Sequence, residues 1–167
     1  GKSLSILEKV PPETGTFSSE VNKNMHIKPY ELLYMALIGS LVYSLLEVAA
    51  RGFTHWTMTV TGGFLAIVLY LMNWHAPPHT RLLQYITGAI MITAVEMLVG
   101  VADNLILHWN VWDYTDMPLN LYGQICLPFT ILWFFLCIPA LWLCERVASL
   151  FHPFRREHPH YTTPFRK

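Results

Sequence analysis

The sequence contains four long apolar stretches, and these constrain the fold more than any other feature. They cover residues 30–50, 56–74, 82–107 and 119–144. Each has the roughly 20 residues that a helix needs to cross a hydrocarbon core about 30 Å thick. Unpaired backbone groups are too costly in lipid, so spanning segments are helices or strands of a closed barrel, and continuous apolarity without alternation indicates helices. The sequence therefore predicts an all-α integral membrane bundle of four transmembrane helices with short loops.

The composition supports a membrane protein over a soluble one. Apolar residues make up 53% of the chain and charged residues 13%, about half of the quarter that is typical of soluble domains. A soluble four-helix bundle would carry long charged faces on its helices, and these stretches lack them. Lys+Arg and Asp+Glu both number 11, so no basic excess suggests nucleic acid as a partner.

Polar segments flank the spans and divide the chain into three parts. We expect a polar N-terminal segment over 1–28, a four-helix transmembrane domain over 29–148 and a basic tail over 149–167. An even number of crossings places both termini on one side, together with the connection between the second and third spans. That side carries all but one of the 11 basic residues, the exception being Arg51. The positive-inside rule therefore predicts a multi-pass protein of the cell membrane with both termini in the cytoplasm.

Ionisable and amide residues inside the spans are candidates for a functional site, because charges in lipid are costly. Those of the first, third and fourth spans recur at helical spacing, so each set shares one face of its helix. Such faces need partners, and we expect them to turn toward one another inside the bundle. They comprise Glu47 and Arg51, which can pair four residues apart, Glu96, Asp103 and Asn104 in the third span, and Asn120 and Gln124 at the start of the fourth.

Most of these groups are expected in the outer half of the membrane, beneath the loop that carries Trp112, Asp113 and Tyr114. Acidic residues there outnumber the single basic residue, Arg51, and such an imbalance does not stay ionised in a low dielectric. Either carboxyl groups are protonated, or water or a cation reaches them. We therefore predict a polar acidic cavity in the outer half of the bundle. A purely structural role in holding the helices together stays open as the alternative reading.

The histidines add one candidate. His55 and His108 lie near the outer ends of the second and third spans, where Asp103 or Glu47 would complete a set of metal ligands. The spacing of known metal motifs is absent. We therefore predict no metal and no cofactor, and keep His55 as a ligand-binding candidate.

Three stretches of the sequence resemble a single family of bacterial membrane proteins. They are LLEVAARGFTHWTMTVTGG at 45–63, ITAVEMLVGVADN at 92–104 and WNVWDYTDMPLNLYGQICLPFTILW at 109–133. These stretches are similar to the CmpB-like ABC-transporter permease family. The resemblance implies a membrane subunit of a transport system, with its ATPase on a separate chain.

The predicted function is thus a permease or transport-system membrane subunit that binds a ligand in the acidic cavity. Four spans are few for a complete permease, so we expect a homo-oligomer or another membrane subunit as partner, besides membrane lipids. Two alternatives stay open: an intramembrane lipid-binding protein or enzyme that uses Glu96 or Asp103 as acid or base, and a structural membrane scaffold. No catalytic residue is assigned. The ligand-binding candidates are Glu47, Arg51, His55, Glu96, Asp103, Asn104, Trp112, Asp113, Tyr114, Asn120 and Gln124.

Overall fold

The computed structural model describes residues 26–76 and 80–153 of the chain. Within these ranges, four helical segments are long and apolar enough to cross a membrane, and the described residues contain no β-strand. The elements are α2 (Pro29–Arg51), α3 (Trp56–His75), α4 (Arg81–Gly100), which continues directly into the π-helix η2 (Val101–Ile106), and α5 (Leu127–Phe151). The predicted all-α membrane fold is confirmed.

The apolar stretches predict the first three spans to within one residue at each end. The fourth begins and ends later than expected, at Leu127–Phe151 instead of residues 119–144. Three residues between 119 and 126 have positive φ, and Pro128 lies in the first turn of α5, where its missing N–H is not needed. The prediction that Asn120 and Gln124 open the fourth span is therefore wrong, because both belong to the preceding connection.

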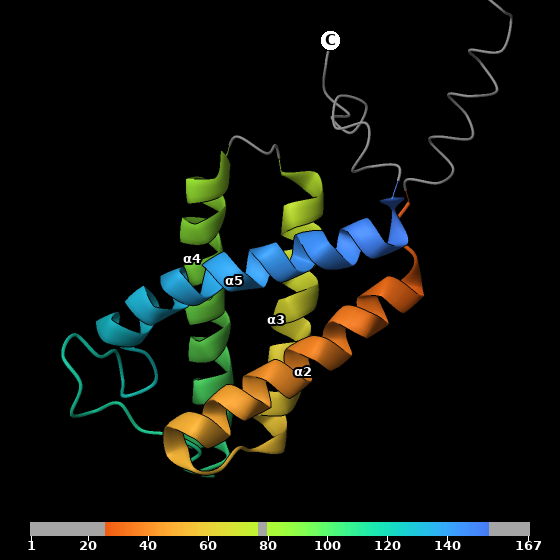
Figure 1. Ribbon diagram of the computed structural model, residues 1–167. Coiled ribbons are helices and arrows are strands. Elements are labelled where there is room, and N and C mark those ends of the chain that lie inside the picture. The colour runs from red at the N-terminus through yellow and green to blue at the C-terminus, as the bar shows by residue number, and fades with distance from the viewer. Residues whose placement is uncertain (1–25, 77–79, 154–167) are drawn as a thin grey trace, which may run out of the picture.

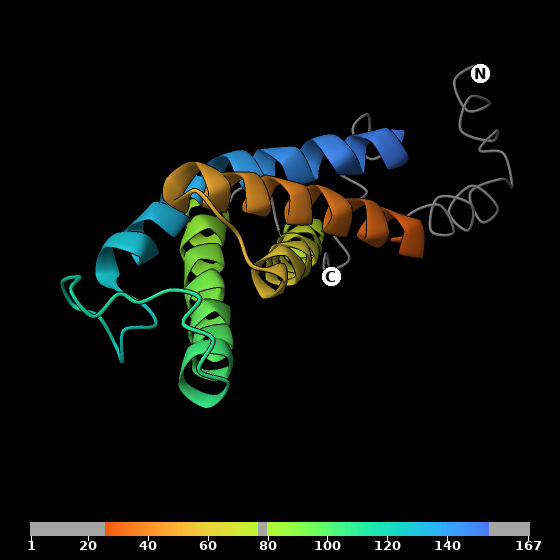
Figure 2. The same ribbon diagram turned by 90° about the horizontal axis from the view of Figure 1, so that it is seen from below.

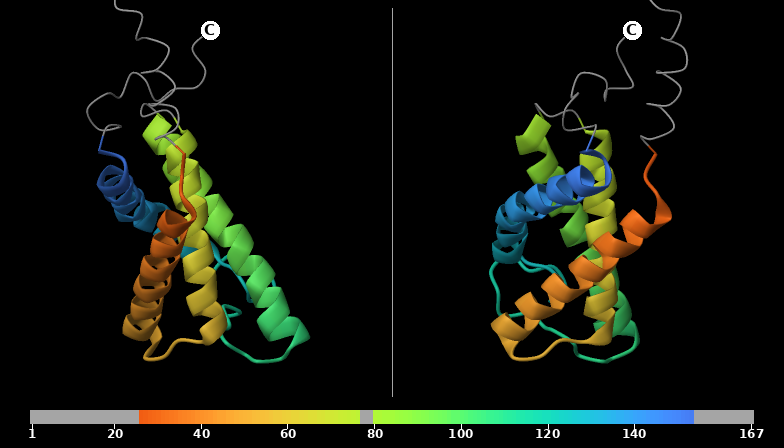
Figure 3. Two further views of the ribbon diagram at one scale, coloured as in Figure 1. Left: turned by 90° about the vertical axis from the view of Figure 1, so that its right-hand side faces the viewer. Right: turned by 45° about the vertical axis from the view of Figure 1, so that its right-hand side comes forward.

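The four helices do not form a single parallel bundle. α3 and α4 run in opposite directions, while α5 crosses both of them and α2 crosses α3 (Figures 1 and 2). The start of α2, the end of α3, the start of α4 and the end of α5 lie toward one end of the molecule (Figure 3), called here the terminal end. The end of α2, the start of α3 and η2 lie at the opposite end, called here the loop end.

Glycines bring α2 and α3 into close contact. A Cβ atom on Gly62 would lie 2.3 Å from the Cβ of Tyr43, and one on Gly39 would lie 2.3 Å from the Cβ of Ala66. Close approach of backbones is how small residues promote helix association in lipid. The hydroxyls of Ser44 and Thr59 share a 2.8 Å hydrogen bond across the same interface.

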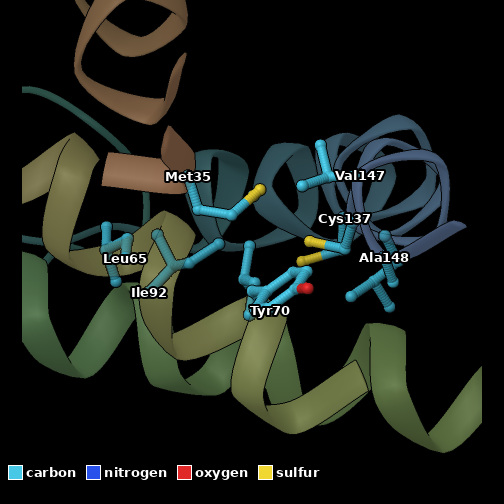
Figure 4. Packing of buried hydrophobic residues seen from close by; sticks show 10 residues of the cluster. Met35, Leu65, Tyr70, Ile92, Cys137, Val147 and Ala148 are labelled. Carbon is cyan, nitrogen blue, oxygen red and sulfur yellow. The ribbon is translucent and has the colours of Figure 1, made fainter. Parts of the chain in front are cut away.

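The apolar core lies where α2, α3, α4 and α5 meet. Met35, Tyr70, Cys137 and Val147 from three of these helices pack together there (Figure 4). The outward face of α2 is also apolar: the leucines at 33, 37, 41 and 45 are 61%, 63%, 61% and 60% exposed. Water-soluble monomers rarely expose apolar patches of such extent, so this face fits a lipid environment.

Candidate functional site

The candidate site is organised by the connection between η2 and α5, residues 107–126, called here the inserted loop. It returns from the end of η2 across the loop end of the bundle (Figure 3). Val111 and Trp112 are buried and pack against Met58 of α3, with Tyr43 of α2 and Val99 of α4 beside them. Val111 and Trp112 therefore fill space between helices, while much of the rest of the inserted loop, including Leu119 and Tyr122, is exposed.

Asn104, on η2, holds the inserted loop in place. Its Oδ1 accepts a hydrogen bond from the backbone N–H of Val111 (2.6 Å), and its Nδ2 donates to the Trp112 carbonyl (3.0 Å) and to Gln124 Oε1 (2.7 Å). The Trp112 indole N–H donates in turn to the Gln124 carbonyl at 2.9 Å. The structure thus brings together three of the predicted site residues, Asn104, Trp112 and Gln124, as anchors of the inserted loop.

The end of α2 provides a second anchor. Glu47 and Arg51 form the ion pair expected from their spacing. Arg51 Nη1 also donates to the Val111 carbonyl at 2.9 Å, and its guanidinium lies 5.1 Å from the centre of the Phe53 ring. Arg51 Nε is buried and has no hydrogen-bond partner among the described residues. Arg51 therefore joins α2 to the inserted loop while it neutralises Glu47.

Glu96 is a buried carboxyl of α4, only 4% exposed. Trp133 of α5 donates its indole N–H to Oε2 at 2.8 Å, and the Tyr114 hydroxyl donates to Oε1 at 3.3 Å. The Tyr114 ring stacks on Phe129, with the centroids 4.6 Å apart. Burial raises the pKa of the Tyr114 phenol, the Glu96 charge raises it further, and the Arg51 charge opposes the rise. Glu96 thus connects α4, α5 and the inserted loop.

Asp103 is equally buried, 4% exposed, and lies on η2 next to Asn104. Its Oδ2 accepts a hydrogen bond from the Thr57 hydroxyl at 2.6 Å. The same hydroxyl oxygen lies 2.7 Å from His55 Nδ1, and the His55 ring contacts that of Trp109 with centroids 5.3 Å apart. Two predicted residues, His55 and Asp103, are therefore linked through a threonine of the second span.

Asp113 and Asn120 shape the inserted loop from within. Asp113 Oδ1 accepts hydrogen bonds from the hydroxyl and the backbone N–H of Thr115, and these bonds lower the pKa of the Asp113 carboxyl. Asn120 Nδ2 donates to the carbonyls of Thr115 and Met117 at 2.8 and 2.9 Å. Gly123 has φ +67°, and a Cβ there would lie 2.7 Å from Asp113 Oδ1. Both predicted residues therefore have partners inside the loop itself.

The predicted site residues form several separate groups. In the part of the chain that the structure describes, no hydrogen bond or ion pair joins the side chains of Glu47, Glu96 and Asp103 to one another. Each carboxyl has its own partner: Arg51, Trp133 with Tyr114, and Thr57. Ligand binding by these residues, and a shared acidic cavity, stay predictions. In residues 26–76 and 80–153, no group of three or more His, Cys, Asp and Glu side chains could hold a metal ion.

Sequence reasoning missed Thr57 and Trp133, and it also missed a buried acidic residue at the terminal end. Glu31 has no exposed surface and accepts from the Tyr70 hydroxyl at 2.9 Å, while His152 Nε2 lies 3.0 and 2.9 Å from its two oxygens. The sequence does carry a signal for Glu31: a carboxyl group lies within the first turn of an apolar stretch, where a charge needs a partner. This contact joins the start of α2 to the end of α5.

A family model described as "Putative ABC-transporter type IV" matches residues 28–162. Neither the curated proteins nor the solved structures contain a significant match to the chain. The matched range includes all four spans and the inserted loop, in agreement with the family resemblance of the three sequence stretches. The chain is therefore a membrane transport-related protein, and it belongs to the family described as "Putative ABC-transporter type IV".

Proposed function

We propose that the chain is the membrane-spanning subunit of an ABC-type transport system. The family match carries this proposal, together with four apolar helices that make up most of the described residues. Such spans offer no fold for nucleotide binding, so we assign ATP hydrolysis to a separate ATPase. Self-association or a second membrane subunit would complete the translocation pathway.

We place the terminal end in the cytoplasm and the loop end on the outer side of the membrane. The distribution of basic residues supports this orientation through the positive-inside rule. The N-terminal segment over 1–28 and the tail over 149–167 are then cytoplasmic, on either side of the transmembrane domain over 29–148. Most of these two segments lies outside the described residues.

In this proposal the inserted loop closes the outer end of the translocation pathway. The observation that supports it is the burial of Val111, Trp112 and Gln124 against the anchors Asn104 and Arg51. When the inserted loop moves out, Glu96 loses Tyr114 as a donor and an acidic cavity opens at the loop end. Carboxyl groups favour a cationic group or a proton over an anion as the ligand.

Backbone strain in the inserted loop also supports a change of conformation. Four residues that are not glycine have positive φ there, His108, Asn110, Leu119 and Tyr122. His and Asn adopt the left-handed region more readily than most residues, whereas for Leu119 and Tyr122 it costs on the order of 1–3 kcal/mol each. This strain offsets part of the stabilisation that the anchoring contacts provide. It therefore lowers the free energy needed to release the inserted loop.

Co-purification tests the proposed function. The full chain, tagged and extracted from its native membranes in mild detergent, is expected to bring down a nucleotide-binding subunit and ATP hydrolysis in constant ratio. Mass spectrometry identifies the co-purified subunit. As a control, substitution of the lysine that binds the ATP phosphates in that subunit should abolish ATP hydrolysis without loss of the complex. A stable chain that never associates with an ATPase in membranes or detergent would contradict the proposal.

One observation favours lipid binding as the second candidate function. A groove of about 460 Å³ lies between α4 and α5, and its lining is largely aliphatic, including Ile90, Met97 and Leu98 of α4 and Ile125 before α5. Native mass spectrometry of the purified chain would show a bound lipid of fixed composition. Loss of that lipid in Ala94→Trp, which would fill the groove, with folding intact and no associated ATPase, would favour this function over transport.

A further inference from the structure

Although the Asp103 carbonyl accepts from the backbone N–H of Trp109 at 2.8 Å, one chain of side-chain hydrogen bonds at the loop end is separate from the side-chain bonds of Asn104 and Arg51. It runs from His55, which is partly exposed at the start of α3, through the Thr57 hydroxyl to the buried Asp103. The two heavy-atom distances are 2.7 Å between His55 Nδ1 and Thr57 Oγ1, and 2.6 Å between Thr57 Oγ1 and Asp103 Oδ2. Both are short enough for proton transfer along the chain.

We propose that His55, Thr57 and Asp103 form a proton relay, in which Asp103 is a buried proton-binding site that exchanges with the loop-end surface. This inference goes beyond the proposed transport function and does not depend on an ATPase partner. Proton relays inside membrane proteins are built from such Asp, Glu and His groups, which are rare within spans because of their cost in lipid.

The transfer step is balanced as follows. In the starting state, His55 is an imidazolium that donates its Nδ1 proton to Thr57 Oγ1, and the Thr57 hydroxyl donates to the Asp103 carboxylate. The Nδ1 proton moves to Thr57 Oγ1 while the hydroxyl proton of Thr57 moves to Asp103 Oδ2. The products are a neutral imidazole, an unchanged threonine and a neutral carboxylic acid, so one proton has passed from His55 to Asp103.

The product state keeps its hydrogen bonds. His55 Nδ1, now without a proton, accepts from the new Thr57 hydroxyl proton and faces the Thr57 backbone N–H, 3.5 Å away, as the N-cap of α3. The order of the groups also distinguishes a relay from a nucleophilic triad. In a Ser-His-Asp triad the imidazole lies between the hydroxyl and the carboxylate, whereas here the hydroxyl lies between the other two.

The location of Asp103 agrees with a functional role. It lies on η2, and π-helical turns within α-helices occur frequently at functional sites. Other titratable groups near the loop end have partners of their own: Glu47 pairs with Arg51, and Glu96 accepts from Tyr114. On the elements packed at the loop end, the other titratable and charged groups are Tyr43, Glu47 and Arg51 of α2, Glu96 of α4, and His108, Asp113, Tyr114, Asp116 and Tyr122 of the inserted loop.

Infrared difference spectroscopy tests the relay. The full chain in lipid nanodiscs is taken from neutral to acidic buffer, and the carboxylic acid band that appears is assigned to Asp103 by its loss in Asp103→Asn. Transfer into heavy water then shifts this band at the rate of proton exchange. We expect Thr57→Val to slow that exchange by at least about tenfold, and His55→Gln, which keeps a hydrogen-bonding cap, to slow it as well.

Two matched variants complete the experiment. Thr57→Ser keeps the hydroxyl and should exchange at the wild-type rate. Thr59→Val makes the same change of shape two residues along α3, where the hydroxyl bonds to Ser44 instead, and should also exchange normally. The proposal is overturned if no Asp103-dependent band appears on acidification. It is equally overturned if folded Thr57→Val or His55→Gln protein exchanges as fast as the wild type.

Discussion

At the scale of single residues, Gly100 shows how closely the inserted loop fits against α4. A Cβ atom on Gly100 would lie 2.6 Å from Gln124 Oε1 and 3.0 Å from Trp112 Cζ2. We predict that Gly100→Ala destabilises the protein by about 1–3 kcal/mol, as overpacking does, in thermal unfolding followed by tryptophan fluorescence. Leu98→Ala is the control on the same helix, since Leu98 is 71% exposed. Equal stability of the two variants would show that the loop does not pack against Gly100.

Tyr114 provides a prediction about alkaline pH. Burial raises the pKa of its phenol above the ordinary value of 10.0, so the folded state keeps a proton that the unfolded chain releases. The contribution of the protonated Tyr114 phenol to the free energy of unfolding is complete below about pH 10. It declines as the pH rises toward the pKa of the phenol in the folded state. Tyr114→Phe should therefore lose less stability than the wild type when denaturant unfolding is repeated above about pH 10. Parallel losses in both proteins would contradict this assignment.

The sequence identified the polar residues of the loop end better than it identified their partners. Asn104 and Gln124 stand out in the sequence because amide groups near lipid need hydrogen bonds. Two of the hydrogen-bond partners of Asn104 are main-chain atoms of Val111 and Trp112. Any residue type can provide a main-chain partner, so the sequence does not reveal which residue it is. Thr57 was overlooked because a threonine hydroxyl can bond within its own helix and needs no distant partner.

At the scale of helices, hydropathy predicted three spans closely and misplaced the start of the fourth. Five of the eight residues 119–126 are apolar and continue into the apolar run of α5, so the apolar pattern alone does not mark where the helix begins. The separating signals are conformational, Pro128 in the first turn of α5 and Gly123 with positive φ. Hydropathy also does not reveal η2. A π-turn changes the direction in which the side chains of Asp103 and Asn104 point, but it does not change the composition of the segment.

The contact between α2 and α5 at the terminal end provides a prediction at this scale. Glu31→Ala removes the buried acceptor shared by Tyr70 and His152, and breaking a buried pair in this way costs about 3–5 kcal/mol. Denaturant unfolding and hydrogen exchange in the last turn of α5 measure the loss. Glu145→Ala is the matched control, because the Glu145–Arg81 pair is 45% and 34% exposed and such pairs contribute about 0–1 kcal/mol. A similar small loss in both variants would contradict the role of Glu31.

At the scale of the whole molecule, different contacts hold the two ends of the bundle together. The terminal end is joined by the buried Glu31–His152 contact, and the loop end is filled by the inserted loop. The sequence predicted four spans and a concentration of polar groups at the loop end. It did not predict that a loop would occupy that space, because the burial of a loop depends on tertiary packing between distant segments, which hydropathy and charge do not encode.

Chemical labelling of Cys126 tests the central claim, that the inserted loop closes the outer end of the bundle, most directly. Cys126 is buried at the junction of the inserted loop and α5, and Cys137 and Cys144 are buried within α5 as internal controls. Asn104→Ala leaves buried partners unsatisfied, at about 1–3 kcal/mol each, and should release the loop.

A membrane-impermeant maleimide is applied to intact cells, and the labelled cysteines are identified by mass spectrometry. The account predicts no labelling of the wild type, and labelling of Cys126 but not of Cys137 or Cys144 in Asn104→Ala. Labelling of Cys126 in the wild type as fast as in the variant, or in the variant only after the cells are opened, would contradict it.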